Sequence, residues 1–343
     1  MIRSFAFTLG AACLALFSLG ATSDHANAAP EEKVVLKIGT MAPAGTPWSA
    51  LMDNFKKRVE AQTGKRIEVK VYLGGKAGDE NEMVKKTGRG HLQAVAASTG
   101  ALASLVPELH AVELPFLFRS FGEADFILDT VLTAPMEKAF RDRGLVFGFW
   151  SENGFRHFGT NFGPVRSPAD LAGKKMRSQE SPVHLEMWSV FKAAAQAIPT
   201  TEVLTALQTG AVDGFDQGLL FAIAANWHKS VKYITLSAHI YQPAAVAFNK
   251  EWFDKLPPDL QKVLQDEGRA LTETGRKLIR KINPDLIGLI EKQGIQVVKL
   301  DAAQRTAFEA ASLPVRAWYR KSQGPSSIKI LDAIEAGLQG FRK

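Results

Sequence analysis

Apolar residues after position 33 recur with two different periods, which predicts strands joined by helices. Residues 34–40 form an apolar run typical of a buried strand. Thr46 and Pro47 then open a helix whose apolar positions recur every three or four residues as far as Val59. Residues 67–73 alternate between apolar and polar positions, which predicts a second strand. A helix between two strands predicts a βαβ unit with parallel strands.

The rest of the chain continues this alternation of strands and helices. The pattern predicts helices near Asp79, at 101–106, over 122–143 with a break at Pro135, and from residue 258 until Pro284 bends or ends it. It predicts strands at 92–97, 145–150, 233–236, 244–248 and 295–300, of which 233–236 and 244–248 cross between domains. No segment repeats at a fixed period.

Residues 173–182 predict a short strand that ends in a turn, followed by a helix that Ser181 caps and Pro182 begins. Arg177 then lies at the carboxyl end of a strand, where open α/β sheets bind their ligands. Its guanidinium offers five donors in a rigid fork, which suits a carboxylate held by two hydrogen bonds. The alternative is a solvated arginine in a basic strip with Lys174 and Lys175.

The N-terminus has the features of a secretory signal peptide, which we assign to residues 1–28. Arg3 precedes an apolar run over residues 5–19, and Ala26-Asn27-Ala28 provides a small-residue cleavage site. The run is too short to favour a membrane-spanning helix. Cys13, the only cysteine, lies inside the run, so we expect cleavage near Ala28 without lipid attachment. The exported protein then folds without disulfides, and its length predicts two domains.

Charge and motif content exclude several classes of function. The net charge of +7 suits an acidic partner, but the basic residues are dispersed and an exported protein does not meet nucleic acid. The seven histidines show no His-x-x-x-His pair, and the mature chain has no thiolate for a metal. Nucleophile-elbow and phosphate-loop motifs are missing. We therefore expect no cofactor, no metal and no catalytic residue. A small anionic ligand remains a possible partner.

Several short motifs, weak alone, occur together in one order along the chain. They are LKIG at 36–39, PW at 47–48, VEAQTG at 59–64, PE at 107–108, LPF at 114–116, GFR at 154–156, LAGKKMR at 171–177, EVLTALQTGAVDG at 202–214 and LPPDLQ at 256–261. From about Val34 to about Gly294 the chain resembles the solute-binding proteins of tripartite ATP-independent periplasmic (TRAP) transporters, of the dicarboxylate-receptor type.

The resemblance implies an α/β, two-lobe fold like that of periplasmic binding proteins, with mixed sheets, hinge strands and a long helix that spans both lobes. We expect lobe I in residues 29–151 plus about 240–270, and lobe II in residues 152–239 plus about 271–343. The protein would be a periplasmic receptor that binds an organic anion in the interlobe cleft. It would deliver this anion to sodium-driven membrane permease subunits.

The resemblance also implies ligand-binding residues. The arginine matching Arg177 clamps the ligand carboxylate, and the one matching Arg156 assists. Gln217 matches a cleft-lining asparagine that the family carries within Glu-Asn-Pro, here changed to Asp-Gln-Gly, and an aromatic residue of the family is Thr200 here. Ser98 matches a ligand-facing position on the other lobe, and Glu80 and Trp48 are looser matches to ligand-binding positions. These three residues complete the expected ligand-binding set. For Glu80 and Trp48 the alternative is a packing or surface role.

Two other functions remain open on the sequence. The same fold serves in modules that present a bound ligand to a receptor kinase. A periplasmic enzyme acting on a carboxylate is the second alternative, with Glu180, His157 or Asp216 as acid or base. One arginine fork suits dicarboxylates, keto acids, hydroxy acids, aromatic acids and sugar acids alike, so the ligand's identity is not readable.

Overall fold

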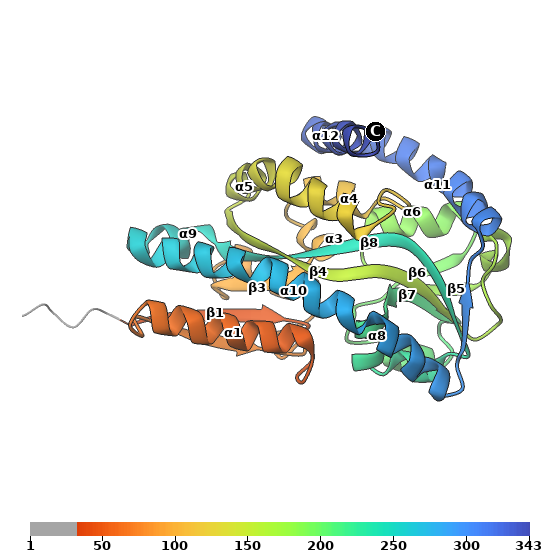
Figure 1. Cartoon of the computed structure of the whole chain (residues 1–343), viewed down its shortest axis with the longest axis horizontal. Coiled ribbons are helices and arrows are strands. Elements are labelled where there is room, and N and C mark those ends of the chain that lie inside the picture. The colour runs from red at the N-terminus through yellow and green to blue at the C-terminus, as the bar shows by residue number, and fades with distance from the viewer. Residues whose placement is uncertain (1–32) are drawn as a thin grey trace, which may run out of the picture. The chain divides into compact units, whose positions relative to one another are not determined.

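The computed structural model describes residues 33–343. The predicted signal peptide at residues 1–28, its cleavage site and Cys13 lie outside the described residues. Strands and helices alternate along the described chain (Figure 1). In chain order they are β1 (Val34–Thr40), α1 (Pro47–Gln62), β2 (Ile67–Tyr72), α2 (Glu80–Gly88), β3 (Ala94–Ser98), α3 (Thr99–Leu102), η1 (Pro107–Glu113), α4 (Phe121–Phe126), η2 (Ile127–Leu132), α5 (Thr133–Asp142), β4 (Leu145–Thr160), η3 (Pro168–Leu171), β5 (Lys175–Ser178), α6 (Pro182–Val190), β6 (Ala194–Ala197), α7 (Val203–Gln208), β7 (Gly214–Gly218), α8 (Leu219–Ala224), η4 (Trp227–Ser230), β8 (Tyr233–Asn249), α9 (Lys250–Asp254), α10 (Pro258–Lys292), β9 (Gln296–Lys299), α11 (Ala302–Ser322) and α12 (Pro325–Phe341).

The strands of the described chain form one mixed sheet in the order β2-β1-β3-β8-β4-β7-β5-β6, with β9 beside β8. β1 is parallel to β2, with Val34 opposite Ile67, so the predicted βαβ unit is confirmed. A second parallel group is formed by β7, β5 and β6. The long strands β4 and β8 are antiparallel to each other and join the two groups, because β8 is antiparallel to β3 and β4 is antiparallel to β7. The short strand β9 is parallel to β8. This arrangement confirms the expected α/β fold with two lobes joined by hinge strands.

The two joining strands are longer than the sequence pattern predicts. β4 has 16 residues and β8 has 17, and they pair from Leu145 opposite Asn249 to Thr160 opposite Tyr233. The predicted strands at 145–150, 233–236 and 244–248 are only their ends. Register shifts interrupt the β4–β8 ladder at three places, one of them between Glu152 and Gly154. Such bulges bend and twist a strand, as a crossing between two lobes requires.

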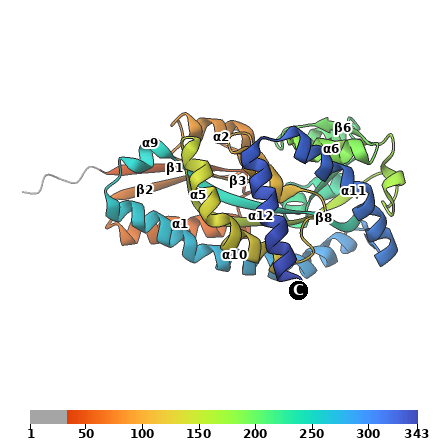
Figure 2. The ribbon, with the colours of Figure 1, turned by 90° about the horizontal axis from the view of Figure 1, so that it is seen from above.

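Helices cover both faces of the sheet, and α10 follows it along its length (Figures 1 and 2). α10 packs against α1 and β4 and, further along, against α8 and β9. Of the two expected effects of Pro284, an end of the helix is wrong, because the helix continues to Lys292, and a bend stays a prediction. The proline costs the helix one hydrogen bond, and the apolar side that α10 presents to the sheet outweighs this loss. Leu286 and Ile290, both beyond the proline, are buried on that side.

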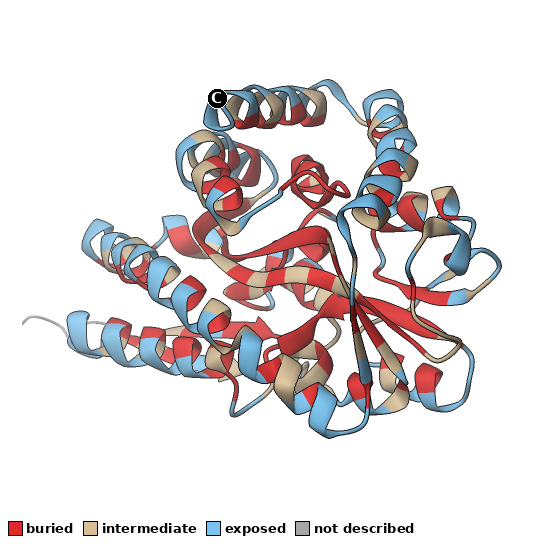
Figure 3. Cartoon of the chain, turned by 45° about the vertical axis from the view of Figure 1, so that its right-hand side comes forward, coloured by how far each residue is buried: buried red, intermediate tan, exposed pale blue. Residues whose placement is uncertain are grey.

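Buried residues lie along the sheet and on the sides of the helices that face it, and exposed residues lie on the outer sides of the helices (Figure 3). One group joins α1 and the start of α10 to β1, and another joins α7, α8 and the end of α10 to β7. A third group extends from α2 and η1 to α6 and α11. The C-terminal helix α12 packs on η1 and η2. The expected lobe boundaries stay a prediction.

The stretch 173–182 forms the predicted strand and helix, as β5 and α6. Ser181 occupies the N-cap position, but its hydroxyl makes no capping hydrogen bond, so the expected side-chain cap is wrong. Pro135 does not break its helix, because it lies in the first turn of α5, where a missing N–H costs little. The irregularity of this region is the π-helical turn η2 just before it.

Candidate functional site

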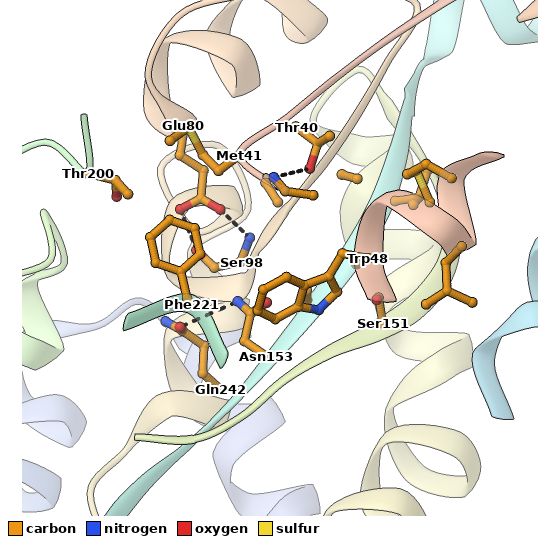
Figure 4. A pocket seen from close by; sticks show the side chains of 18 of the residues that line it. Thr40, Met41, Trp48, Glu80, Ser98, Ser151, Asn153, Thr200, Phe221 and Gln242 are labelled. Carbon is orange, nitrogen blue, oxygen red and sulfur yellow. Dashed lines mark hydrogen bonds between the residues drawn. The ribbon is translucent and has the colours of Figure 1, made fainter. Parts of the chain in front are cut away.

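A narrow cavity of about 70 Å³ lies where β1, β3 and β7 end beside the crossing strands β4 and β8. Its wall combines apolar side chains with hydroxyl and amide groups and one carboxylate, that of Glu80 (Figure 4). The lining residues are Thr40, Met41, Ala42, Trp48, Leu51, Met52, Glu80, Ala96, Ala97, Ser98, Ser151, Asn153, Gln179, Thr200, Gln217, Phe221, Gln242, Ala244, Ala245 and Val246. Four of the six predicted site residues are among them: Trp48, Glu80, Ser98 and Gln217.

Glu80 and Ser98 form a hydrogen-bonded pair at one end of the cavity (Figure 4). Glu80 Oε1 accepts from the backbone N–H of Ser98 at 2.7 Å, and Oε2 accepts from the Ser98 hydroxyl at 2.8 Å. Asp79 caps α2 and thereby fixes the position of Glu80 at its first residue. The Ser98 hydroxyl also accepts from Ala101 N as the cap of α3. The carboxylate of Glu80 thus occupies the acceptor position at the start of α3.

Trp48 and Phe221 form the aromatic wall of the cavity. Trp48 projects from α1 and donates its indole N–H to the carbonyl of Glu152 at 2.8 Å. Its ring lies 6.3 Å from that of Phe221, between centroids. Trp48 comes from the first helix and Phe221 from α8, so the two rings approach the cavity from opposite groups of strands (Figure 4). Aromatic faces of this kind suit the C–H groups of a small ligand.

Arg177 does not line the cavity, but it contacts Thr200, which does. Its Nε and Nη2 donate to the carbonyl of Ile198 at 3.0 and 2.9 Å, and Nη2 also reaches Thr200 Oγ1 at 3.4 Å. The residue is 1 % exposed, and its guanidinium stacks on Trp227 at 5.3 Å. Burial, and then the charge of Arg156, lower the pKa of Arg177 to about 10. The Nη1 atom is buried without a hydrogen-bond partner.

Arg156 lies behind the cavity at the centre of a buried network. Its Nε pairs with Asp216 Oδ2 at 2.6 Å, and its Nη2 donates to the Asp216 carbonyl. Its Nη1 donates to the amide oxygens of Gln242, Gln217 and, more weakly, Gln179, all three of which line the cavity. Although burial alone raises it, the charge of Arg156 holds the pKa of Asp216 well below its ordinary value. Arg156 therefore acts on the cavity through the three glutamines.

Hydrogen bonds cross the cleft between the two groups of strands. Gln179, which follows β5, donates to the Ser98 hydroxyl at the end of β3 at 2.9 Å. At the surface, Asn81 of α2 donates to the carboxylate of Glu180 at 3.0 Å. These contacts connect the β5–α6 turn directly to α2 and β3. A ligand entering the cavity must therefore do so while the contacts are open.

Sequence reasoning missed several lining residues, among them Gln179, Gln242, Asn153 and Phe221. Gln179 lies two positions after Arg177, the spacing that places side chains on the same side of an extended chain, and this signal was available. Gln242 and Asn153 lie in the central parts of β8 and β4, where polar residues hide the strand pattern. Phe221 gives no signal, because an aromatic residue in a short apolar helix is usually part of the core.

The acid or base residues of the alternative enzymatic function are each engaged in a structural contact. Glu180 accepts from Asn81, Asp216 pairs with Arg156, and His157 Nδ1 accepts from the backbone N–H of Ala238 at 3.1 Å. Neither Glu180 nor His157 lines the cavity. Between residues 33 and 343 no group of three or more histidine, cysteine, aspartate or glutamate side chains could hold a metal ion. No helix in that range is long and apolar enough to cross a bilayer.

Three histidines, His110, His157 and His239, have pKa values that burial lowers, which makes the fold sensitive to acid. His110 is 7 % exposed, and burial lowers its pKa from 6.5 to about 4. Burial also lowers the pKa of His239, which lies against Ser237 and Asp216. A histidine with a lowered pKa stays neutral in the folded protein while the unfolded chain takes up a proton. Its contribution to stability is present above about pH 6.5 and is lost as the pH falls.

We therefore expect the free energy of unfolding to fall between about pH 6.5 and pH 4, with His110 alone contributing a loss of about 2 kcal/mol at about pH 5. The raised pKa values of Glu80 and Glu152, due to burial, oppose this trend in part. Urea unfolding at several pH values measures the slope. His110→Gln should flatten it and His91→Gln, at an exposed histidine, should not. An unchanged slope in His110→Gln would contradict the assignment.

Comparison with known families gives a match over most of the described chain. The family described as bacterial extracellular solute-binding protein, family 7 (DctP), matches residues 38–322. A solute-binding protein of Verminephrobacter eiseniae is 31 % identical over 297 residues, which cover 87 % of this chain and 88 % of that protein.

Solved structures of similar proteins have the same fold. A TRAP periplasmic solute-binding protein from Polaromonas sp. JS666, bound to D-erythronate, is 29 % identical with a TM-score of 0.83, covering 89 % of this chain and 99 % of that one. A TRAP periplasmic solute-binding protein from Sulfurospirillum deleyianum, with bound succinate, is 27 % identical with a TM-score of 0.82, covering 88 % and 99 %.

Proposed function

The chain belongs to family 7 of the bacterial extracellular solute-binding proteins, and from this premise we propose that Arg177 clamps the carboxylate of its ligand in the cavity between the lobes. The protein is a solute receptor of the TRAP type. Its ligand is a small organic anion, which it delivers to the permease subunits of its transporter. The signal peptide at residues 1–28 directs the protein to the periplasm, and this peptide is removed by cleavage near Ala28.

The observation that carries the carboxylate clamp is the state of Arg177. Its guanidinium is buried, its Nη1 has no hydrogen-bond partner, and it makes no ion pair with any described residue. A buried charge without a counter-charge is costly, and buried polar atoms are nearly always paired. A ligand carboxylate beside Thr200 supplies both the missing acceptor and the missing charge. Arg156 cannot take this role directly, because Asp216 already neutralises it.

Binding and closure are coupled through residues of both lobes. In the open cleft Arg177 is exposed to water, and closure over a carboxylate removes that water and strengthens the charge-assisted hydrogen bonds. A ligand favours the closed state only if it gains contacts there. Ser98 and Trp48 on one side, and Gln217 and Thr200 on the other, provide them. The receptor then presents a closed form with its ligand to the permease.

The protein binds its ligand without converting it. The groups that an enzyme would use as acid or base, Glu180, His157 and Asp216, are held in structural contacts. The compared structures contain a hydroxylated monocarboxylate and a dicarboxylate, so the fold alone does not select the class of acid.

The test is to purify the exported protein from periplasm without unfolding it, release the bound compound by denaturation, and identify it by mass spectrometry. We expect an unmodified organic carboxylate, and calorimetry should then show that the emptied protein binds this compound at one site. Release of a compound without a carboxylate would overturn the proposal. Appearance of a product on incubation with the released acid would show turnover instead.

A further inference from the structure

Among residues 33–343, Glu80 is the only charged residue that lines the cavity. Both of its oxygens are fixed by Ser98, one through the backbone N–H and one through the hydroxyl. Each oxygen accepts one hydrogen bond from the described residues, and a carboxylate oxygen has room for a second. No cation pairs with Glu80 in the described part of the chain. The cavity therefore has an acidic end with free acceptor capacity.

Positive charge comes closest to the described cavity wall at Arg177, beside the lining residue Thr200. Arg156 is neutralised by Asp216, which leaves Arg177 as the uncompensated cation near the cavity. The remaining polar lining groups are hydroxyls and amides, which carry no charge. Arg177 Nη2 lies 3.4 Å from the hydroxyl of Thr200, which lines the same cavity as Glu80. The site can compensate one carboxylate, not two.

The negative charge of Glu80 and the positive charge of Arg177 distinguish monocarboxylates from dicarboxylates. A ligand held by its carboxylate at Arg177 extends toward Glu80, where a hydroxyl group can donate to a carboxylate oxygen. A second carboxylate at that position would meet a fixed negative charge without a counter-ion, in a region where burial strengthens the repulsion. Like charges placed together across an interface are an effective means of rejecting a wrong ligand.

We propose that Glu80 restricts the ligand of this receptor to hydroxylated monocarboxylates, by accepting a hydrogen bond from a ligand hydroxyl and repelling a second carboxylate. The inference rests on the proposed function, since it requires one carboxylate at Arg177. Burial raises the pKa of Glu80, as expected for a carboxylate without a cationic partner, although the hydrogen bonds from Ser98 oppose this shift.

Two matched pairs of acids test the inference on the purified, emptied protein. D-erythronate and meso-tartrate differ only in that a terminal CH₂OH is a carboxylate in the second, and D-galactonate and galactarate differ in the same way at a longer chain length. Calorimetry should give an affinity for at least one of the two monocarboxylates that is about a hundredfold higher than for its dicarboxylate partner.

The variant Glu80→Gln keeps the size and much of the hydrogen bonding of the side chain but removes its charge. We expect it to reduce the ratio of monocarboxylate to dicarboxylate affinity at least tenfold, mainly by improving dicarboxylate binding. Glu82→Gln is the matched control, because it removes the same charge from the same helix at a largely exposed side chain. The ratio should not change in Glu82→Gln.

The outcomes separate this inference from the proposed function. A dicarboxylate bound as tightly as its partner, or an unchanged ratio in Glu80→Gln, would overturn the role of Glu80 and leave the carboxylate receptor standing. The same holds if all four acids fail while a carboxylate without hydroxyl groups binds. If the protein binds no carboxylate of any class, the proposed function is wrong and this inference falls with it.

Discussion

Arg177→Ala is expected to weaken binding of the receptor's carboxylate ligand by about two to four decades. The clamp combines charge-assisted hydrogen bonds with a counter-charge inside a site from which closure removes water. Without the guanidinium, the ligand carboxylate is buried beside the Thr200 hydroxyl and the Ile198 carbonyl, neither of which compensates its charge. Calorimetric titration of the variant with the ligand identified from the native protein measures the loss.

Folding of this variant is not expected to fail, because Arg177 makes no ion pair whose other member would be left buried. Thermal unfolding of the unliganded variant checks this point. Arg177→Lys should also bind poorly, because a point charge cannot form the two-pronged contact. Lys175→Ala removes a charge from an exposed position of the same strand and should leave the affinity unchanged. Near-native affinity in Arg177→Ala would reject the clamp.

The parts of the fold that sequence predicts best are those in which one local pattern decides the structure. β1 has the predicted bounds, because a mainly apolar run that ends at a loop with Pro43 and Gly45 is typical of a buried strand. Thr46 and Pro47 begin α1 as expected, since a capping side chain and a fixed φ act within one turn. The same holds for β5 and the start of α6 around Pro182.

The central halves of β4 and β8 escape prediction because their polar residues serve the site. Glu152, Asn153 and Arg156 interrupt the apolar run of β4, yet each is paired inside the protein. Glu152 accepts from Tyr241 and from Arg280 of α10, partners that lie far away in sequence. A strand segment with polar residues that line a cleft has the sequence pattern of a loop. Only the positions of its hydrogen-bond partners show that it is a strand.

The candidate site shows the same division. Arg177 is conspicuous in the sequence because it follows a strand, but its burial and its unpartnered Nη1 are visible only in three dimensions. Arg156 is equally conspicuous, and its neutralisation by Asp216 depends on the pairing of β4 with β7. The sequence therefore singles out both arginines as candidates, and their different pairing, Arg156 with Asp216 and Arg177 without an ion pair among the described residues, is visible only in the structure.

The buried ion pair of Arg156 with Asp216 leads to the largest expected effect on stability. Asp216→Ala should lower the free energy of unfolding by about 3–5 kcal/mol, because it leaves a fully buried guanidinium without its counter-charge. The hydrogen bond from His239 to the same carboxylate is lost as well. Urea unfolding followed by circular dichroism measures the change. Asp254→Ala, which breaks partly exposed ion pairs with Lys250 and Arg141, should cost less than about 1 kcal/mol.

The double replacement Arg156→Met with Asp216→Leu separates the cost of an unpaired charge from the worth of the pair. If the penalty in Asp216→Ala arises from the stranded guanidinium, removing both charges should recover part of the lost stability, because apolar groups of similar size have no desolvation cost. Recovery should be incomplete, since Gln217 and Gln242 lose the donor that fixes their amide oxygens. A double variant less stable than Asp216→Ala would show instead that the other hydrogen bonds of Arg156, to Gln217, Gln242 and the carbonyl of residue 216, stabilise the protein by more than its unpaired charge costs. In that case the main contribution of the Arg156 guanidinium to stability would be the hydrogen bonds by which it connects β4 to β7 and β8. The fold would then require Arg156 for its stability, and Arg177 would be the arginine left to bind an anion.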